Sequence, residues 1–203
     1  FLRKIISISN LKGGVGKTTL AVHIAKKAAS LGCKTLLIDA DKQGNATSKF
    51  NLPEFEHVLY DVIKKECSLN DAILTVNEFL HIVPSNLKNQ MLENELTSKQ
   101  MNKVGYFKRN LEETEYELII IDTEPNLSQI NFMAITSSDL NIAPVKLDND
   151  SLDGLELMLN FIEDAKQEWP DLEVKTAAVI NNYDGRMTTS LKKISELQDM
   201  GVH

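Results

Sequence analysis

The chain alternates short apolar runs, rich in β-branched residues, with amphipathic stretches of helical spacing along most of its length. The runs that we expect to form strands are Lys4–Ser9, Thr35–Ile38, Leu80–Val83, Glu117–Ile121, Asn141–Pro144 and Val174–Ile180. Between the first two, Leu20, Ile24 and Leu31 fall on one face of a helix. Such alternation is typical of parallel βαβ units. The sequence therefore predicts an α/β fold, a mostly parallel twisted sheet with helices on both faces.

Length and composition fit one globular domain. With 203 residues, 42% of them hydrophobic and 25% charged, the chain can bury a core, and no repeat or linker divides it. The segment 51–100 is the least regular part, where we expect two or three short helices and one strand, with Ser68 as a helix cap. Because the chain stops soon after a helical pattern, we expect residues 1–203 to be a single domain that lacks its C-terminal end.

Charge and hydropathy exclude several classes of protein. The apolar runs are too short to cross a bilayer, so we expect no membrane span and a cytoplasmic location. Cys33 and Cys67 are too few and too far apart for a disulfide scaffold or a C-x-x-C metal site. The net charge of −7 argues against a broadly basic surface for nucleic acid and leaves room only for a local basic patch.

The most specific motif is the run Lys12-Gly13-Gly14-Val15-Gly16-Lys17-Thr18-Thr19, directly after the first predicted strand. Its glycines allow backbone N–H groups to turn toward an anion, and the following helix adds the positive end of its dipole. Lys17 is suited to the β- and γ-phosphates of a nucleotide, and the Thr18 hydroxyl to Mg²⁺. The alternative is a glycine-rich turn that binds nothing. We expect an ATP or ADP site whose binding residues are Gly13, Gly14, Val15, Gly16, Lys17, Thr18 and Thr19.

This run departs from the common phosphate-loop pattern, because Leu11 replaces a glycine and Lys12 adds a second lysine. In this form it resembles the deviant Walker A box of the ParA/MinD family of P-loop ATPases. In that family the additional lysine reaches the nucleotide bound by the partner subunit. The resemblance therefore implies an ATP-sandwich homodimer in which Lys12 acts across the interface.

A second apolar strand delivers two aspartates in the run Leu36-Leu37-Ile38-Asp39-Ala40-Asp41-Lys42-Gln43-Gly44-Asn45. A Mg·ATP site needs carboxylates near the metal and a group that orients the attacking water. The run resembles the switch I motif D-x-D-P-Q-G-N of ParA proteins, which implies that Asp39 lies near Mg²⁺ and Asp41 positions the water. Lys42 replaces the proline of that motif, which leaves the hydrolysis rate open. The alternative is that both aspartates cap the following turn.

A third strand ends in an acid at Ile121-Asp122-Thr123-Glu124-Pro125, which has the form of a Walker B motif followed by switch II. Asp122 would hold Mg²⁺ through water. In ParA-like chains the first of two prolines stands where this chain has Glu124. A carboxylate aimed at a triphosphate would be repelled, so we expect Glu124 to face solvent, the partner subunit or a basic residue.

Later stretches extend the resemblance. Ile142–Val145 followed by Leu152–Leu155 resembles the strand and helix that face the dimer partner, and the run around Asn181 resembles the strand end that contacts adenine. An amide can pair with the adenine edge, so Asn181 is our base-reading candidate, and an Asn in a turn is the alternative. Helical spacing makes Met158, Phe161 and Trp169 packing residues rather than a ligand box.

The resemblance implies a Mg²⁺-dependent ATPase, slow and stimulated by a ParB-type protein, that binds DNA without sequence specificity and partitions plasmids or chromosomes. Lys12, Lys17 and Asp41 would be its catalytic residues, with Thr18, Asp39 and Asp122 at the metal. The basic residues available for DNA are Arg186, Lys192 and Lys193, although a solvated helix face explains them equally well. Such a protein would lie in the bacterial cytoplasm, at the nucleoid while ATP is bound. A MinD-like membrane-positioning ATPase and a nucleotide-binding regulator with little hydrolysis are the alternatives.

Overall fold

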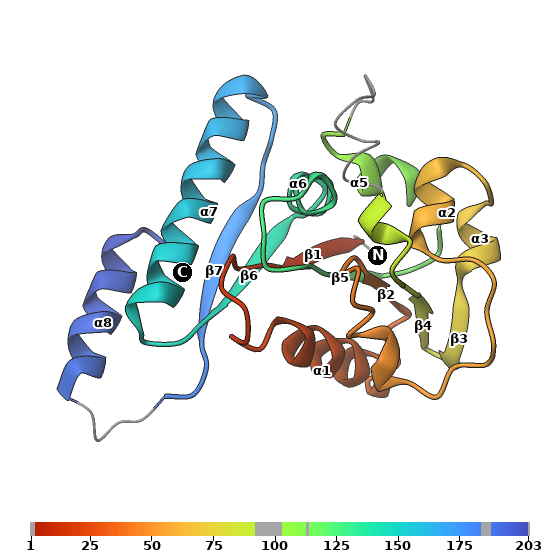
Figure 1. The fold of residues 1–203 in the computed structure, drawn as a ribbon, viewed down its shortest axis with the longest axis horizontal. Helices are drawn as coiled ribbons and strands as arrows, with labels where there is room; N and C mark the ends of the chain where they lie inside the picture. Colours follow the sequence, from red (N-terminus) through yellow and green to blue (C-terminus); the bar gives the residue numbers. More distant parts are fainter. Residues whose placement is uncertain (1–2, 92–102, 113, 184–187, 203) are drawn as a thin grey trace.

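One seven-stranded sheet organises the chain, with strand order β3-β4-β2-β5-β1-β6-β7 (Figure 1). The computed structural model describes residues 3–91, 103–112, 114–183 and 188–202. The strands are β1 (Lys4–Ile8), β2 (Thr35–Asp39), β3 (Leu74–Asn77), β4 (Leu80–Val83), β5 (Leu118–Asp122), β6 (Leu140–Val145) and β7 (Lys175–Ile180). Every pairing is parallel except that of β3 with β4. The predicted fold class is confirmed.

Helices cover both faces of this sheet (Figure 1). They are α1 (Lys17–Ser30), α2 (Leu59–Lys64), α3 (Leu69–Ala72), α5 (Tyr106–Asn110), α6 (Gln129–Thr136), α7 (Asn149–Glu168) and α8 (Thr188–Asp199). Side chains of β2 alternate between two cores, because Leu36 and Ile38 pack with α2, α5 and α6, whereas Leu37 packs with α1. A third core joins α7 and α8 to β6 and β7.

All six predicted strands form, with their ends shifted by one residue at most. The expectation of one strand in the segment 51–100 was wrong, because β3 precedes β4 there as an antiparallel edge strand. Only Leu74 and Val76 of β3 reach the core, too few to mark a strand. The cap at Ser68 is confirmed, since its hydroxyl accepts a hydrogen bond from the Asp71 N–H.

The strand order determines where the motifs meet. β1 lies beside β5, and β5 lies beside β2, so the carboxyl ends of these strands share one edge. In this register Ile8 and Asp39 both stand opposite Asp122. The sheet therefore brings the glycine-rich loop and both acidic loops together. Among the described residues, no helix combines the length and apolar character needed to span a membrane.

Candidate functional site

The glycine-rich loop joins β1 to α1 and has the backbone of an anion-binding turn. Gly14 and Gly16 have φ values of 71° and 103°, a region that favours glycine. A side chain at Gly16 would also come within 2.6 Å of the Asn181 amide nitrogen. Gly16 caps α1, whose first turn carries no acidic residue, so nothing there opposes an anion at the positive end of the helix.

A cavity of about 340 Å³ lies over this loop. Its lining comes from the loop, from the first turn of α1 and from the ends of β2 and β5: Gly13, Gly14, Gly16, Lys17, Thr18, Thr19, Asp41, Asn45, Thr123 and Pro125. The structure thus brings together most of the predicted binding residues. Val15 and Asn181 are the exceptions, because neither lines the cavity, and the Val15 side chain is fully buried in the protein.

The two lysines of the loop lie in opposite surroundings. Lys17 is buried in the cavity, where its ammonium donates to the Lys12 carbonyl at 3.1 Å. Burial lowers the pKa of Lys17, while the carboxylates of Asp122 and Asp41 act in the other direction. The Lys12 side chain is 41% exposed and pairs with Asp150 of α7 at 2.6 Å, a contact that raises the pKa of Lys12. Lys12 is therefore outside its own cavity.

Asp122 ends β5 as a fully buried carboxylate. Neither of its oxygens accepts a hydrogen bond of ordinary geometry from the described residues. Burial, followed by the charge of Asp39, raises the pKa of Asp122 to about 8, although the nearby Thr18 hydroxyl and Lys17 ammonium oppose this. A cation beside these oxygens would offset the cost of burying the charged carboxylate.

These residues fit Mg²⁺, which commonly takes one or two carboxylates and completes its shell with water and phosphate oxygens. Thr18 and Asp122 would hold it, in agreement with the unpartnered oxygens of Asp122. In the described part of the chain, no cluster of three His, Cys, Asp or Glu side chains forms a metal site by itself.

Asp39 and Asp41 both cap the loop that follows β2, as the structural alternative predicted. The buried Asp39 accepts the N–H and hydroxyl of Thr47 at 2.7 and 2.6 Å. Burial nevertheless raises the pKa of Asp39 to about 6. Asp41 accepts from the Gln43 N–H and the Asn45 amide, and it also lines the cavity. The metal role of Asp39 and the water-orienting role of Asp41 stay predictions.

Of the three surroundings expected for Glu124, namely solvent, the partner subunit or a basic residue, the structure shows the basic residue. The Glu124 carboxylate is buried and lies 3.4 Å from the Lys42 ammonium. This ion pair connects the loop after β2 with the loop after β5, and it joins the two residues that depart from the ParA pattern.

The Asn181 amide contacts the glycine-rich loop. Its nitrogen donates to the Val15 carbonyl at 2.8 Å, and its oxygen accepts from the Asn182 N–H at 3.0 Å. Both ends of the amide are therefore used within the chain. A role in reading a base stays a prediction.

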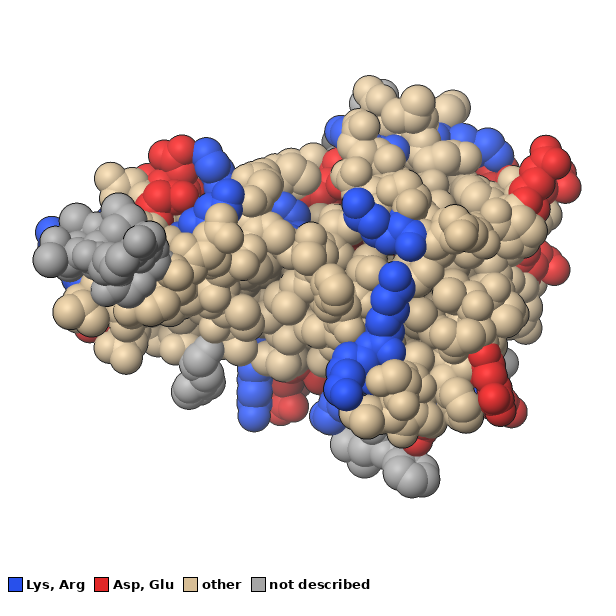
Figure 2. Space-filling view, turned by 90° about the horizontal axis from the view of Figure 1, so that it is seen from below, with Lys and Arg blue, Asp and Glu red and all other residues tan. Residues whose placement is uncertain are grey.

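The basic candidates for DNA are only partly described. Arg186 lies outside the described residues. Lys192 and Lys193 belong to α8 and both pair with Glu196, and Lys193 also donates to Asn149 of α7. On the face that carries α1, Lys and Arg side chains form a short row near the middle, whereas Asp and Glu lie mainly toward the edges (Figure 2). The DNA contacts stay predictions.

Two residues that the sequence reasoning missed support the loop. The buried Asn10 donates to the Pro144 carbonyl at 3.0 Å and accepts the Lys12 N–H at 2.9 Å. A Cβ at Gly154 of α7 would lie 3.0 Å from the Asn10 side-chain oxygen and 3.2 Å from the Lys12 nitrogen. The sequence signal for this contact was a glycine inside a helical pattern, because such a glycine often marks a place where another segment packs closely against the helix.

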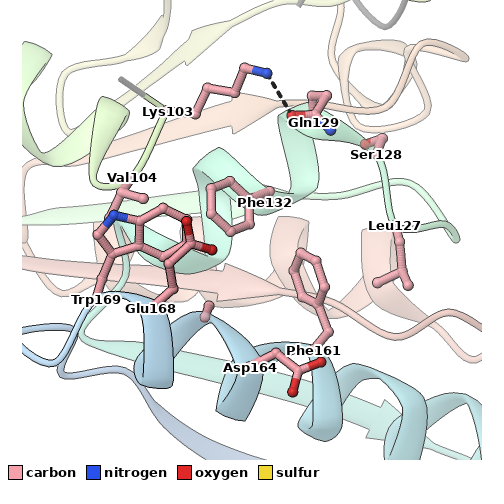
Figure 3. A pocket seen from close by; sticks show the side chains of 11 residues that line it. Lys103, Val104, Leu127, Ser128, Gln129, Phe132, Phe161, Asp164, Glu168 and Trp169 are labelled. Carbon is pink, nitrogen blue, oxygen red and sulfur yellow. Dashed lines mark hydrogen bonds between the residues drawn. The ribbon is translucent and has the colours of Figure 1, made fainter. Parts of the chain in front are cut away.

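A second cavity, of about 610 Å³, lies between α6 and α7 (Figure 3). Phe132 packs edge-on against Phe161 and at a tilt against Trp169, with ring centres 5.6 Å apart in each pair. Met158 is buried in the neighbouring core, which confirms it as a packing residue. Phe161 and Trp169 also pack, yet they line this cavity. It carries no residue of the phosphate, switch I or Walker B motifs.

Comparisons with known proteins cover most of the chain. A family described as an AAA domain matches residues 3–174. The sporulation initiation inhibitor protein Soj of Bacillus subtilis is 33% identical over 201 residues, covering 96% of this chain and 79% of that protein. A plasmid partition protein from Borrelia burgdorferi has a crystal structure that is 26% identical, with a TM-score of 0.83 over 98% of this chain and 86% of that chain. Cobyrinic acid a,c-diamide synthase from Mycobacterium smegmatis, with bound ATP analogue and magnesium, shares the fold at 24% identity, with a TM-score of 0.88 over 98% and 82% of the two chains.

Proposed function

The chain belongs to the ParA/MinD family of P-loop ATPases, and we propose that it is a ParA-type ATPase that dimerises around ATP, binds DNA without sequence specificity and partitions a plasmid or chromosome. The relatives support the partition role, because one of them is a plasmid partition protein. The resemblance carried by the run Lys12–Thr19 is thereby confirmed at the level of the family.

The proposed reaction is Mg²⁺-dependent hydrolysis of ATP in the cavity over the glycine-rich loop. The loop N–H groups and the Lys17 ammonium bind the phosphates. Thr18 and Asp122 hold Mg²⁺, whose charge offsets that of the phosphates when it is bound. Asp41 lines the cavity and orients the attacking water. The site therefore works by position and charge, as phosphoryl transfer requires.

The observation that carries the proposal is the position of Lys12. Its ammonium lies on the surface and pairs with Asp150, which is itself exposed. An exposed ion pair contributes little to stability because water screens both charges, so a triphosphate on a second subunit can replace Asp150 as the partner of Lys12. Lys12 is therefore available to complete the site of another copy of this chain.

The proposed setting is the bacterial cytoplasm, where the ATP-bound dimer binds the nucleoid and a ParB-type protein stimulates hydrolysis. Because the net charge is −7, DNA would be held by a local basic patch rather than by the whole surface.

The test is binding of the purified protein to a random-sequence DNA duplex, by fluorescence anisotropy, with ATP, with ADP and without nucleotide. We expect the protein to bind DNA only when ATP is present, and to form a dimer by light scattering in the same condition. A monomer in ATP would contradict the sandwich. ATP-dependent binding to anionic lipid vesicles instead of DNA would favour the MinD-like alternative.

ATP turnover separates the regulator alternative from the ATPase. We expect Asp41→Ala to hydrolyse ATP much more slowly than the parent, with and without DNA. Equal rates would remove Asp41 from the mechanism, and negligible turnover in the parent would favour a regulator.

A further inference from the structure

We propose that the ion pair between Lys42 and Glu124 is a positioning link that couples switch I to switch II and holds Asp41 in its catalytic place. This inference rests on the proposed ATPase function. Lys42 directly follows Asp41, and Glu124 lies two residues after Asp122. The pair therefore joins the loops that carry the proposed water-orienting and metal-holding carboxylates.

The side chains of the pair lie next to the residues that line the cavity and are not part of the lining. Asp41, which precedes Lys42, lines the cavity, and so do Thr123 and Pro125 on either side of Glu124. Lys42 and Glu124 do not line it. A change to either side chain alters the support of the cavity without removing a group from its lining.

Burial makes the loss of either partner of the ion pair costly. The Glu124 side chain is 4% exposed and that of Lys42 is 32% exposed, with 3.4 Å between the ammonium and the carboxylate. A buried carboxylate that loses its counter-ion is strongly unfavourable. Glu124 therefore restrains Lys42, and the backbone of Lys42 restrains Asp41.

Each loop is also fixed to the body of the protein next to the pair. The Asp41 carbonyl accepts the Ser85 hydroxyl at 2.6 Å. The Glu124 carbonyl accepts the Asn131 amide at 2.7 Å. The Ala40 N–H also donates to the Asp122 carbonyl at 2.8 Å, which joins the backbones of the two loops. The ion pair adds a side-chain connection between these loops, which come from the neighbouring strands β2 and β5.

The same positions carry proline in the ParA pattern that this sequence resembles. Proline fixes one backbone angle of its own loop and does not respond to the other loop. An ion pair makes the conformation of each loop depend on the other, and it can open and close. This chain therefore has a reversible link where the pattern has two independent stiff residues.

The test is a double-mutant cycle of Lys42→Met, Glu124→Gln and the double variant, with ATP turnover measured in the presence of DNA. We expect each single variant to lower kcat about tenfold, and the double variant to be no slower than either, because residues in contact couple. The KM for ATP should change less than about twofold, since a positioning residue acts on the reaction more than on binding. Lys42→Pro with Glu124→Pro should recover kcat.

The matched control is Lys88→Met, which breaks an ion pair with the equally buried Asp61 at 3.2 Å. Its kcat should equal that of the parent even where its melting temperature falls. Multiplicative effects in the cycle, or a lower melting temperature with unchanged kcat in the Lys42 and Glu124 variants, would overturn the link.

Hydrogen exchange of the nucleotide-free protein tests the link without turnover. Lys42→Met should accelerate exchange in 39–47 and also in 122–126, and Glu124→Gln should do the same. Acceleration confined to the substituted loop would overturn the inference. If the parent lacks turnover while exchange is coupled, the link stands and the proposed ATPase function fails.

Discussion

The two lysines of the glycine-rich loop are separated by burial. Lys17 lies inside the cavity, where desolvation lowers its pKa and favours the neutral amine. An anion bound close to Lys17 would stabilise its charged form. Lys12 is exposed and already paired with the Asp150 carboxylate. A nucleotide in the same chain therefore gains from Lys17, whereas Lys12 is left for a group that approaches from outside.

Substitution of each lysine should accordingly affect a different measurement. Lys17→Ala should weaken binding of a fluorescent ATP analogue by about 100-fold or more, because it removes a buried charge-assisted contact to phosphate. Lys12→Ala should keep that affinity within about threefold and abolish the ATP-dependent dimer seen by light scattering. Loss of nucleotide affinity in Lys12→Ala, with the dimer intact, would reverse the assignment.

The raised pKa of Asp122 predicts how the stability of the nucleotide-free protein depends on pH. The pKa values of Asp39 and Asp122 are raised to about 6 and about 8, so the folded state binds their protons more tightly than the unfolded state. This stabilisation is complete below about pH 4 and is lost as the pH rises through 6 and 8. The free energy of unfolding should therefore fall between about pH 4 and about pH 8.

Asp122→Asn tests this dependence, because the amide has the size of the carboxyl group and no charge. We expect its melting temperature to exceed that of the parent at about pH 9 by roughly 3 °C or more, and the difference to shrink at pH 5. The variant should also lose the stabilisation that Mg²⁺ and ATP give the parent. Parallel melting curves across the whole pH range would contradict the role of Asp122.

At the level of elements, α7 is part of the phosphate site although none of its residues lines the cavity. Gly154 allows the helix to approach Asn10 and the Lys12 nitrogen closely, and Asp150 at the start of the helix holds the Lys12 side chain. A shift of α7 would therefore displace the glycine-rich loop.

Gly154→Ala measures this contact. The added methyl group would lie 3.0 Å from the Asn10 oxygen, so the loop or the helix must move by a few tenths of an ångström. We expect roughly tenfold weaker nucleotide binding, even though alanine favours the helix by about 1 kcal/mol. Glu156→Ala on the exposed side of α7 is the control and should bind as the parent does. Unchanged affinity in Gly154→Ala would show that α7 does not constrain the loop.

Regular elements and motif order could be predicted from the sequence, because apolar periodicity and parallel strand ends determine both. Contacts between segments that are separated in the sequence could not be predicted from it. No local pattern indicates that Thr47 would donate hydrogen bonds to Asp39, or that Lys42 would form an ion pair with Glu124 on the loop of the neighbouring strand. The edge strand β3 was not predicted because it contributes only Leu74 and Val76 to the core.

At the level of the whole molecule, the acidic balance limits how DNA can be bound. A net charge of −7 per chain opposes approach to a polyanion, and dimerisation doubles it. Binding must then rely on few phosphate contacts, and its salt dependence should be shallow. Basic residues that are already neutralised within the chain contribute little to such a patch.

Lys192 and Lys193 are adjacent on α8 and differ in this respect. The side chain of Lys192 is 83% exposed and lies 3.8 Å from Glu196, whereas that of Lys193 is 20% exposed and lies 2.8 Å from the same carboxylate. If α8 faces DNA, Lys192→Ala should reduce the slope of log affinity against log salt by about 1, because one phosphate contact is lost. Lys193→Ala should leave the slope unchanged, since its charge is engaged by Glu196 and Asn149. Anisotropy titrations of the ATP-bound dimer at several salt concentrations measure both slopes. Identical slopes for the parent and both variants would exclude α8 from the DNA surface, and the contacts would then have to come from another face of the dimer.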